Sequence, residues 1–190
     1  MNKNIIILIL INKNPMNIKI LITGLPRSGK STLITQLIEH YSKKQMKIYG
    51  FLTPEVREGN HRIGFDVEEI NTKKREKLAR ISSSNSKYHL GNYSVYIKNF
   101  EEIISKLEKV QFREGDLIIV DEIGKMELFS IKFRDFITKI FNSNIPIIAS
   151  IGLKVKKSIR DHLLSFPDVN LFTLNRDNFQ KTYQKIISMI

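Results

Sequence analysis

Cysteine is absent from the 190-residue chain, and its absence removes several kinds of chemistry at once. Disulfide bonds, thiolate catalysis and cysteine-ligated zinc are all excluded, and a reducing, cytoplasmic environment fits this composition. Hydrophobic residues make up 42% of the chain and charged residues 26%, which is ordinary globular usage. At this length we expect one domain with its own hydrophobic core.

The amino-terminal part lacks an apolar run long enough to cross a membrane. The run Ile5–Ile11 superficially resembles a signal peptide, but Asn12–Pro15 follows where a cleavage site of small residues should stand. The run is also far shorter than the roughly 20 residues that span a bilayer. Met16 offers a second start directly before the first expected strand. We therefore expect residues 1–15 to be a dispensable extension, residues 16–190 to form a single domain, and no membrane association.

A signature of nucleic-acid binding is also missing, although the net charge of +12 invites that interpretation. Lysine is spread along the whole chain beside abundant isoleucine and asparagine, as expected from an AT-rich genome. No basic run carries interleaved aromatic residues, and no helix-turn-helix pattern is present. Part of the charge can attract anionic nucleotides, so nucleic-acid binding stays an alternative that rests on net charge alone.

Apolar strand patterns alternate with helical patterns along most of the chain. Strands are expected at Ile18–Thr23, Ile48–Thr53, Leu117–Val120, Ile145–Ile151 and Val169–Thr173. Helices are expected at Lys30–Lys43, from an Asn99 cap to Val110 with Glu102 reaching back, at Ile131–Phe141, at Lys157–Leu164 and from Asp177 onward. This alternation predicts an α/β fold with a mainly parallel central sheet flanked by helices.

Two segments depart from this alternation. Val56–Ile70 places Glu58–Asn60 between β-prone flanks, which predicts a β-hairpin insert. Lys73–Tyr96 is polar, and Ser82–Ser86 within it is typical of a mobile loop. We find no internal repeat and no second domain.

The segment Gly24–Ser31 matches G-x-x-x-x-G-K-S/T, the P-loop pattern that cradles phosphates. It follows an expected strand and opens an expected helix, which is the context that the pattern requires. Its glycines allow a tight turn with N–H groups facing inward, and the helix adds the positive end of its dipole. Lys30 is expected to reach the β- and γ-phosphates, Ser31 to coordinate Mg²⁺, and Thr32 to contact the α-phosphate.

Two acids, Asp121 and Glu122, follow the apolar strand that starts at Leu117. Ligands bind at the carboxyl edge of a parallel sheet, so we expect Asp121 to hold Mg²⁺ together with Ser31. Glu122 is then expected to polarise a water for in-line attack on the γ-phosphorus, and Lys30 joins these two acids as a catalytic residue. The predicted nucleotide-binding residues are Gly24, Leu25, Pro26, Arg27, Ser28, Gly29, Lys30, Ser31, Thr32, Ile119, Val120, Asp121, Glu122, Ile123, Gly124 and Lys125.

The chain also lacks the arginine cluster that forms the lid of many kinases, since Arg160 and Arg176 are isolated. A hydrolase must activate water, whereas a kinase must exclude it and place an acceptor hydroxyl. Glu122 therefore favours a Mg²⁺-dependent phosphohydrolase that cleaves an NTP to NDP and phosphate, which we expect to be a monomer with modest turnover. The alternatives are a P-loop phosphotransferase acting on a nucleotide or polynucleotide, and a nucleotide-switched nucleic-acid-binding module.

Several linked motifs together resemble the THEP-type nucleoside-triphosphatases, also described as cancer-related nucleoside triphosphatases. Besides the P-loop, the motifs are Gly50–Arg57, Arg62–Asp66, Gly91–Val95, Asp121–Leu128 and Thr173–Asp177, and the resemblance runs from about Ile18 to Asn178. It implies a RecA-like P-loop domain and slow, Mg²⁺-dependent hydrolysis of ATP, GTP, CTP and UTP with little base preference.

The resemblance further implies an extra strand, Ile145–Ile151, between the P-loop strand and the acid-bearing strand. This strand would place Ser150 near the γ-phosphate as a polar sensor. The resemblance also implies that Glu55, Arg57 and Arg62 extend toward the edge of the sheet where the P-loop and the two acids lie. For each of them the alternative is a structural ion pair.

The sequence allows more than one role for four further residues. Lys125 and Glu127, just past the acids, are expected to orient the base or to neutralise charge, again with a structural ion pair as the alternative. Arg27 stands where many relatives have glycine, which leaves the path of the loop open. Arg176, after the last strand, would stack on a nucleobase without reading its identity.

Overall fold

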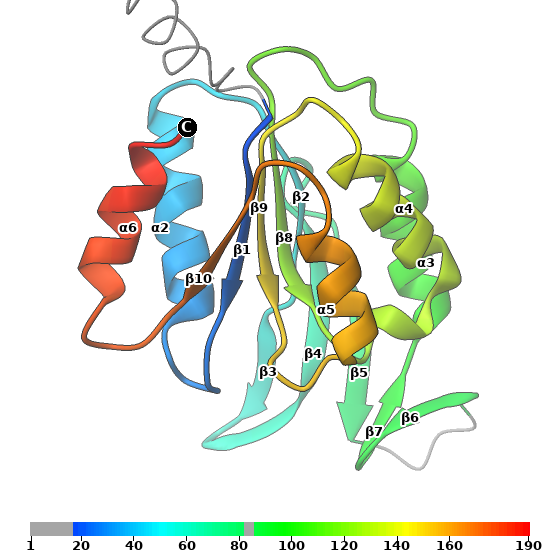
Figure 1. Ribbon diagram of the computed structural model, residues 1–190. Coiled ribbons are helices and arrows are strands. Elements are labelled where there is room, and N and C mark those ends of the chain that lie inside the picture. The colour runs from blue at the N-terminus through cyan, green and yellow to red at the C-terminus, as the bar shows by residue number, and fades with distance from the viewer. Residues whose placement is uncertain (1–16, 82–85) are drawn as a thin grey trace, which may run out of the picture.

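The computed structural model describes residues 17–81 and 86–190, which form a ten-stranded sheet with helices on both faces (Figure 1). The predicted extension 1–15 and most of the predicted loop Ser82–Ser86 lie outside these described residues. The strands are β1 (Lys19–Thr23), β2 (Ile48–Leu52), β3 (Glu55–Glu58), β4 (His61–Glu69), β5 (Arg75–Ile81), β6 (Tyr88–Leu90), β7 (Tyr93–Val95), β8 (Leu117–Ile123), β9 (Ile147–Ile151) and β10 (Val169–Thr173).

The helices fall on the two faces of this sheet. They are α2 (Lys30–Lys43), α3 (Ile97–Leu107), the short 3-10 helix η2 (Glu127–Phe129), α4 (Ile131–Phe141), α5 (Lys157–Leu164) and α6 (Phe179–Ile187). In Figure 1, α2 and α6 lie on one side of the sheet, and α3, α4 and α5 lie on the other. None of these described helices combines the length and apolar character needed to cross a membrane.

The parallel half of the sheet has the strand order β10-β1-β9-β8-β2. The predicted extra strand is confirmed, because β9 pairs with β1 on one side and with β8 on the other. In this arrangement the P-loop after β1, the acids of β8 and Ser150 of β9 all lie near the carboxyl edge of the sheet. We call this edge the active edge, since parallel α/β sheets bind ligands there.

The other half of the sheet, β3–β7, is an antiparallel wing formed by residues 55–81 and 86–95. β4 runs antiparallel to β2, and β3 pairs with β4 around Gly59–Asn60. Because β4 returns toward β2 from beyond the end of that strand, the first residues of β4 project past the active edge. Figure 1 shows β3, β4 and β5 extending below the ends of the parallel strands.

The wing corrects the interpretation of Lys73–Tyr96 as a polar stretch with a loop, because this segment contains β5, β6 and β7. Leu78 and Ala79 are fully buried on β5, whereas Arg75 and Lys77 are exposed. An antiparallel strand with one solvated face needs few apolar residues, which made this strand look like a loop.

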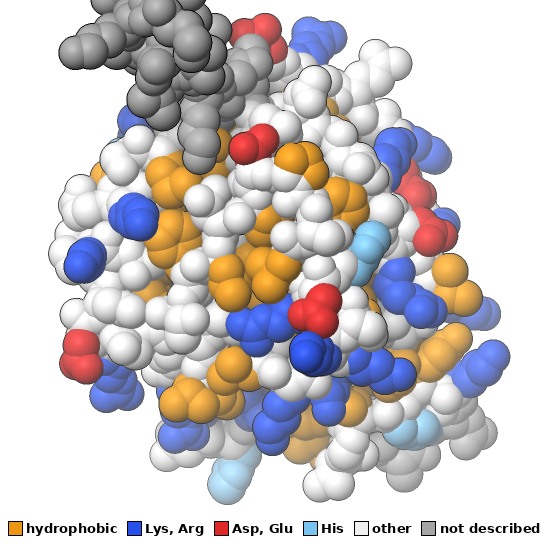
Figure 2. All heavy atoms as spheres, in the orientation of Figure 1, with side chains coloured by type: hydrophobic (Ala, Val, Ile, Leu, Met, Phe, Trp, Pro, Cys, Tyr) orange, Lys and Arg blue, Asp and Glu red, His pale blue; other side chains and the backbone are white. Residues whose placement is uncertain are grey.

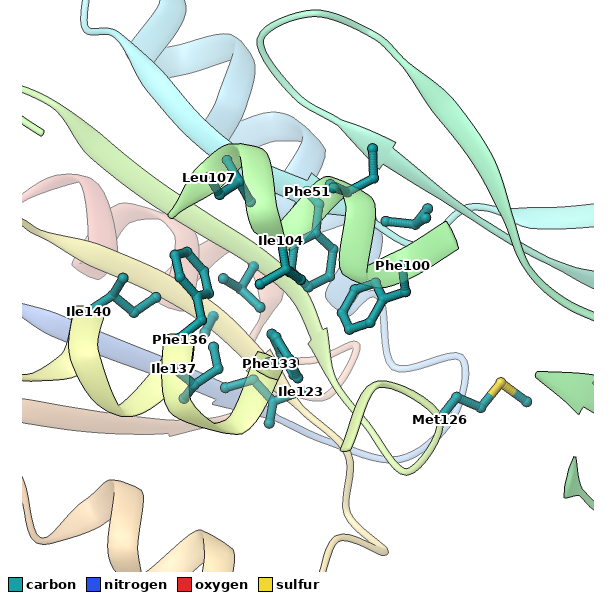
Figure 3. Packing of buried hydrophobic residues seen from close by; sticks show 14 of the residues in the cluster. Phe51, Phe100, Ile104, Leu107, Ile123, Met126, Phe133, Phe136, Ile137 and Ile140 are labelled. Carbon is teal, nitrogen blue, oxygen red and sulfur yellow. The ribbon is translucent and has the colours of Figure 1, made fainter. Parts of the chain in front are cut away.

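Successive residues of each central strand face opposite helix layers. Ile20 and Ile22 pack in the cluster beneath α2 and α6, whereas Leu21 packs in the cluster beneath α3, α4 and α5. In the cluster beneath α3, α4 and α5, the rings of Phe51, Phe100 and Phe133 pack edge to face with centroids 5.1–5.6 Å apart (Figure 3). Burial on both faces fixes the parallel strands, and with them the loops of the active edge.

Two helices begin at other residues than predicted. The helix α6 begins at Phe179, two residues after the expected Asp177. The helix α3 begins at Ile97 with Tyr96 at the cap position, three residues before the expected Asn99 cap. Asn99 instead donates from its side chain to the Lys77 carbonyl of β5, so a contact between elements replaces the local cap. Glu102 pairs with Lys74 across the same boundary.

Candidate active site

The P-loop joins β1 to α2 and is supported from the carboxyl-terminal part of the chain. A Cβ on Gly24 would lie 2.5 Å from the Leu174 carbonyl oxygen and 2.6 Å from Ser28 Oγ. Gly29 has φ +98°, and a Cβ there would lie 3.2 Å from the Phe179 ring. Close approach requires glycine at position 24, and Gly29 combines a positive φ with a tight contact to the Phe179 ring. The carboxyl-terminal part of the chain, from Leu174 to Phe179, thus packs directly on the phosphate loop.

Arg27 takes the left-handed backbone conformation, with φ +65° and an exposed side chain. Its glycine-like conformation keeps the turn of the loop in spite of the side chain. For an L residue this region costs roughly 1–2 kcal/mol relative to glycine.

We expect Arg27→Gly to stabilise the protein by about 0.5 kcal/mol, because relief of the left-handed conformation outweighs the greater freedom of glycine when unfolded. Urea denaturation of the variant and the parent chain would measure this difference. Arg27→Ala is the matched control, since it removes the guanidinium group and keeps the conformational cost. An equal gain in both variants would assign the effect to the side chain and contradict the backbone explanation.

Polar groups at the base of the P-loop are arranged to receive a ligand. Lys30 Nζ donates to the carbonyl oxygens of Gly24 at 3.1 Å and Leu25 at 3.3 Å. The hydroxyls of Thr23 and Ser28 are buried and have no hydrogen-bond partner among the described residues. Buried hydroxyls are normally paired, so these two fit a site whose missing partner is a phosphate oxygen or an ordered water. Thr23 was not predicted, although it directly precedes the motif.

The acid-bearing strand continues through both carboxylates, three residues beyond its predicted end. The pairing of β8 with β9 shifts register between Val120 and Ile123, so the irregularity spans Asp121 and Glu122. Such irregularities redirect side chains and are common beside active sites. Asp121 is 5% exposed, and its Oδ1 accepts a hydrogen bond of 2.6 Å from Ser150 Oγ.

Ser31 also interacts with the Asp121 carboxylate, so the P-loop and β8 meet at this side chain. Burial raises the pKa of Asp121 above its ordinary value, while the bond from Ser150, the interaction with Ser31 and the charge of Lys30 oppose this change. Hydroxyl and carboxylate oxygens are the ligands that Mg²⁺ prefers, and Mg²⁺ sites use few protein ligands beside substrate phosphates and water. The pair Ser31 and Asp121 therefore fits Mg²⁺. The described part of the chain contains no group of three or more His, Cys, Asp and Glu residues that could hold a metal ion.

Glu122 lies between two glycines. A Cβ on Gly124 would lie 2.9 Å from Glu122 Oε1, and a Cβ on Gly152 would lie 3.2 Å from the same oxygen. Burial raises the pKa of Glu122, and the neighbouring charge of Asp121 raises it further, whereas Lys30 lowers it. The loops after β8 and β9 thus enclose this carboxylate at the active edge, an arrangement that the sequence spacing of Gly124 and Gly152 did not predict.

The residues of the wing that were directed toward the active edge pair with one another. Glu55 accepts from Arg57 at 3.1 Å and from Arg62 at 2.9 Å, and Arg62 also donates to the Tyr93 hydroxyl at 3.0 Å. All three charged side chains are partly exposed, with 42–47% of each side chain accessible. The structural ion pair that was the alternative for Glu55, Arg57 and Arg62 is therefore present.

Basic side chains surround the active edge on the face covered by α5. Figure 2 shows Lys and Arg gathered on the lower half of this face with few acidic side chains among them. Between β9 and the middle of α5, Lys154, Lys156, Lys157 and Arg160 follow one another without an acid and form no salt bridge within the described residues. This unpaired positive charge favours the approach of an anionic ligand.

The loop after β10 holds Arg176 at the surface. Asn175 and Asn178 bond each other reciprocally through backbone N–H and side-chain oxygen at 2.9 and 2.8 Å, and Asn178 also donates to the Thr173 carbonyl. This braced turn leaves Arg176 exposed beside the segment that packs on Gly24. Lys125, in the loop after β8, is likewise exposed.

Comparison with known proteins agrees with this geometry. The sequence matches the family described as NTPase over residues 19–187. The nucleoside-triphosphatase THEP1 of Thermotoga maritima is 42% identical over 173 residues, which cover 90% of this chain and 95% of the relative. THEP1 of Methanocaldococcus jannaschii is 31% identical, with 90% and 96% covered.

Two solved structures share the fold. The crystal structure of THEP1 from Aquifex aeolicus has a TM-score of 0.77 and 32% identity, and the match covers 90% of this chain and 98% of that one. The solution structure of a human cancer-related nucleoside triphosphatase has a TM-score of 0.76 and 28% identity, with 90% and 96% covered. With its P-loop fold and these relatives, the chain belongs to the NTPase family and is a nucleoside-triphosphatase.

Proposed function

We propose that this nucleoside-triphosphatase hydrolyses ATP, GTP, CTP and UTP with Mg²⁺ to NDP and phosphate, at a slow rate and with little base preference. One observation carries the proposal: Ser150 donates to Asp121, Ser31 interacts with the same carboxylate, and Glu122, the next residue, lies beside Gly124 and Gly152. Metal-binding oxygens and a candidate base from three separate segments thus meet at one edge.

Each residue has a distinct part in the proposed reaction. The P-loop amides and Lys30 bind and orient the phosphates, and Ser31 and Asp121 would hold Mg²⁺, which neutralises charge on the β- and γ-phosphate oxygens. Glu122 accepts a proton from the attacking water, so that the water oxygen bonds the γ-phosphorus as the bond to the β-phosphate oxygen breaks. Arg57 and Arg62 are paired with Glu55, so this scheme assigns neither of them as an arginine finger. Slow turnover is expected for a scheme without an arginine finger.

Low base preference is consistent with the loop after β10. The side-chain oxygens of Asn175 and Asn178 accept from each other's backbone N–H groups, and the side-chain NH2 of Asn178 donates to the Thr173 carbonyl. Arg176 is exposed in the same turn, and stacking of a base on a guanidinium group does not distinguish one base from another.

Phosphate release from the four NTPs, measured separately with Mg²⁺ and with EDTA, tests this proposal. We expect similar slow rates for all four with Mg²⁺, and loss of at least about 100-fold without the metal, because charge on the phosphates is then uncompensated. Release from one nucleotide alone would contradict the broad specificity. Faster transfer to an added nucleoside or polynucleotide hydroxyl than to water would favour a phosphotransferase, and salt-sensitive stimulation by RNA would favour the nucleic-acid alternative.

Ser150 is expected to act on the metal through Asp121, in place of the predicted γ-phosphate sensor. Ser150→Ala removes the hydrogen bond that orients the Asp121 carboxylate, and loss of such a bond typically costs 10–100-fold in metal affinity or activity. We expect the Mg²⁺ concentration for half-maximal phosphate release to rise by about tenfold. Ser158→Ala, at an exposed position of α5, is the matched control. An unchanged Mg²⁺ dependence in Ser150→Ala would refute this role.

A further inference from the structure

Glu127, at the start of η2, is a buried acid that the proposed reaction does not use. It is 5% exposed, and no Lys, Arg or His of the described chain forms a salt bridge with it. The backbone N–H groups of Gly124 and of Glu127 itself stabilise the ionised carboxyl group, but less than burial disfavours it, so its pKa is raised. A carboxylate buried without a cation is unfavourable, so this environment favours the neutral acid.

The carboxyl group of Glu127 lies close to that of Glu122. A Cβ on Gly124 would lie 2.5 Å from Glu127 Oε2 and 2.9 Å from Glu122 Oε1. Since both oxygens are this close to one point, they are at most 5.4 Å apart. That separation allows a direct hydrogen bond or a link through one water, because each O–H···O contact spans about 2.7–2.8 Å. Gly124 provides the space in which the two carboxyl groups approach.

The two acids therefore resemble a pair in which one member keeps its proton. Burial raises the pKa of Glu127 to about 8, and the nearby charges of Glu122 and Asp121 contribute to the rise. Neighbouring carboxyl groups do not readily ionise together, which favours one neutral and one charged member. Here Glu127 is the more deeply buried of the two, so it is the member that stays neutral.

We propose that Glu127 is a positioning residue for Glu122, to which it donates a hydrogen bond directly or through one water. The bond occupies one oxygen of the Glu122 carboxylate and leaves the other directed at the attacking water. A neutral donor also adds no negative charge beside the phosphates. This role rests on the proposed function of Glu122 as the base.

Lys125, two residues before Glu127, is exposed and forms no salt bridge with it among the described residues. Glu101 of α3 accepts from Ser130, and Lys132 of α4 donates to Ser105. Asp121 and Glu122 face Glu127 from β8. The charged groups that act on Glu127 are therefore Asp121 and Glu122, and Lys30 acts in turn on these two acids.

Glu127→Gln and Glu127→Met separate hydrogen bonding from packing, because both have similar size and only Gln keeps a donor. We expect kcat of Glu127→Gln to stay within about threefold of the parent. Glu127→Met should lose about 10–100-fold in kcat with an unchanged KM, as typical for loss of an orienting partner. Full kcat in Glu127→Met, or equal losses in both variants, would overturn the proposal.

The pH profile provides a second readout that does not depend on the folding of Glu127→Met. As pH rises through about 8, Glu127 of the parent loses its proton, so kcat should fall, whereas kcat of Glu127→Gln should not. The same alkaline fall in both proteins would overturn the proposal. Infrared spectra at pH 7 should contain a protonated-carboxyl band that Glu127→Gln lacks. This measurement needs no turnover, so an inactive parent chain would refute the proposed function alone, and a missing band would refute the neutral Glu127.

Discussion

Replacing Glu122 by glutamine is expected to reduce phosphate release by about 10²–10⁴-fold, the usual contribution of a general base. The amide has the size of the carboxylate and fits between Gly124 and Gly152, but it does not accept a proton from water. Binding of the NTP should stay within about threefold, because the P-loop and Lys30 are unchanged. Single-turnover phosphate release and equilibrium binding of a fluorescent nucleotide would measure the two effects separately.

The matched control for this variant is Glu114→Gln, at an exposed position before β8. It changes the net charge by the same amount and should leave hydrolysis unaltered. If Glu122→Gln kept most of the parent rate, water activation would have to come from another group, and the proposed mechanism would be wrong. Loss of binding together with hydrolysis would instead show that the Glu122 side chain supports the P-loop.

Gly50→Ala is expected to prevent folding or to lower the free energy of unfolding by more than about 4 kcal/mol. Gly50 lies in β2 opposite Ile119 of β8 and has φ +123°. A Cβ there would lie 1.8 Å from the Ile119 carbonyl oxygen and 2.8 Å from its carbonyl carbon. Both atoms belong to the backbone of a buried central strand, so neither moves without breaking the pairing of β2 with β8.

Gly91→Ala separates this steric effect from the effect of backbone conformation. Gly91 also has a positive φ, +56°, but a Cβ there would meet no atom within 4 Å. Its replacement should cost about 1 kcal/mol, the penalty of the left-handed region alone. Urea denaturation followed by circular dichroism would compare the two variants. A similar small loss in both would contradict the close approach of β2 to β8.

Local signals predicted the parts of this protein that depend on local structure. The helices α2, α4 and α5 and the strand β10 begin and end at their predicted residues. In each of these elements apolar residues recur with the period of a helix or a strand and pack against the sheet or the neighbouring helices. The sequence period therefore matches the structure. The P-loop belongs to the same class, because glycine spacing and the strand–helix context restrict the backbone path within eight residues.

The local sequence patterns did not predict the contacts between different helices and strands. The wing strand β5 exposes one face, so its sequence was interpreted as a polar loop. Asn99 was expected to cap its own helix, but its side chain donates to the Lys77 carbonyl of β5 instead. The bond from Ser150 to Asp121 depends on β9 lying beside β8, which strand alternation leaves undetermined. The approach of Glu127 to Glu122 depends in turn on the tight loop at Gly124.

The support of the P-loop by Leu174 and Phe179 has a consequence for biosynthesis. Residues 24–31 leave the ribosome early, but the two groups that pack on Gly24 and Gly29 are translated some 150 residues later. The strand β10, which pairs with β1, is also late. Even though domains generally begin to fold during synthesis, the nascent chain therefore carries the complete phosphate motif for most of its translation without the packing that holds it in shape. Nucleotide binding on the ribosome should appear only after α6 has emerged.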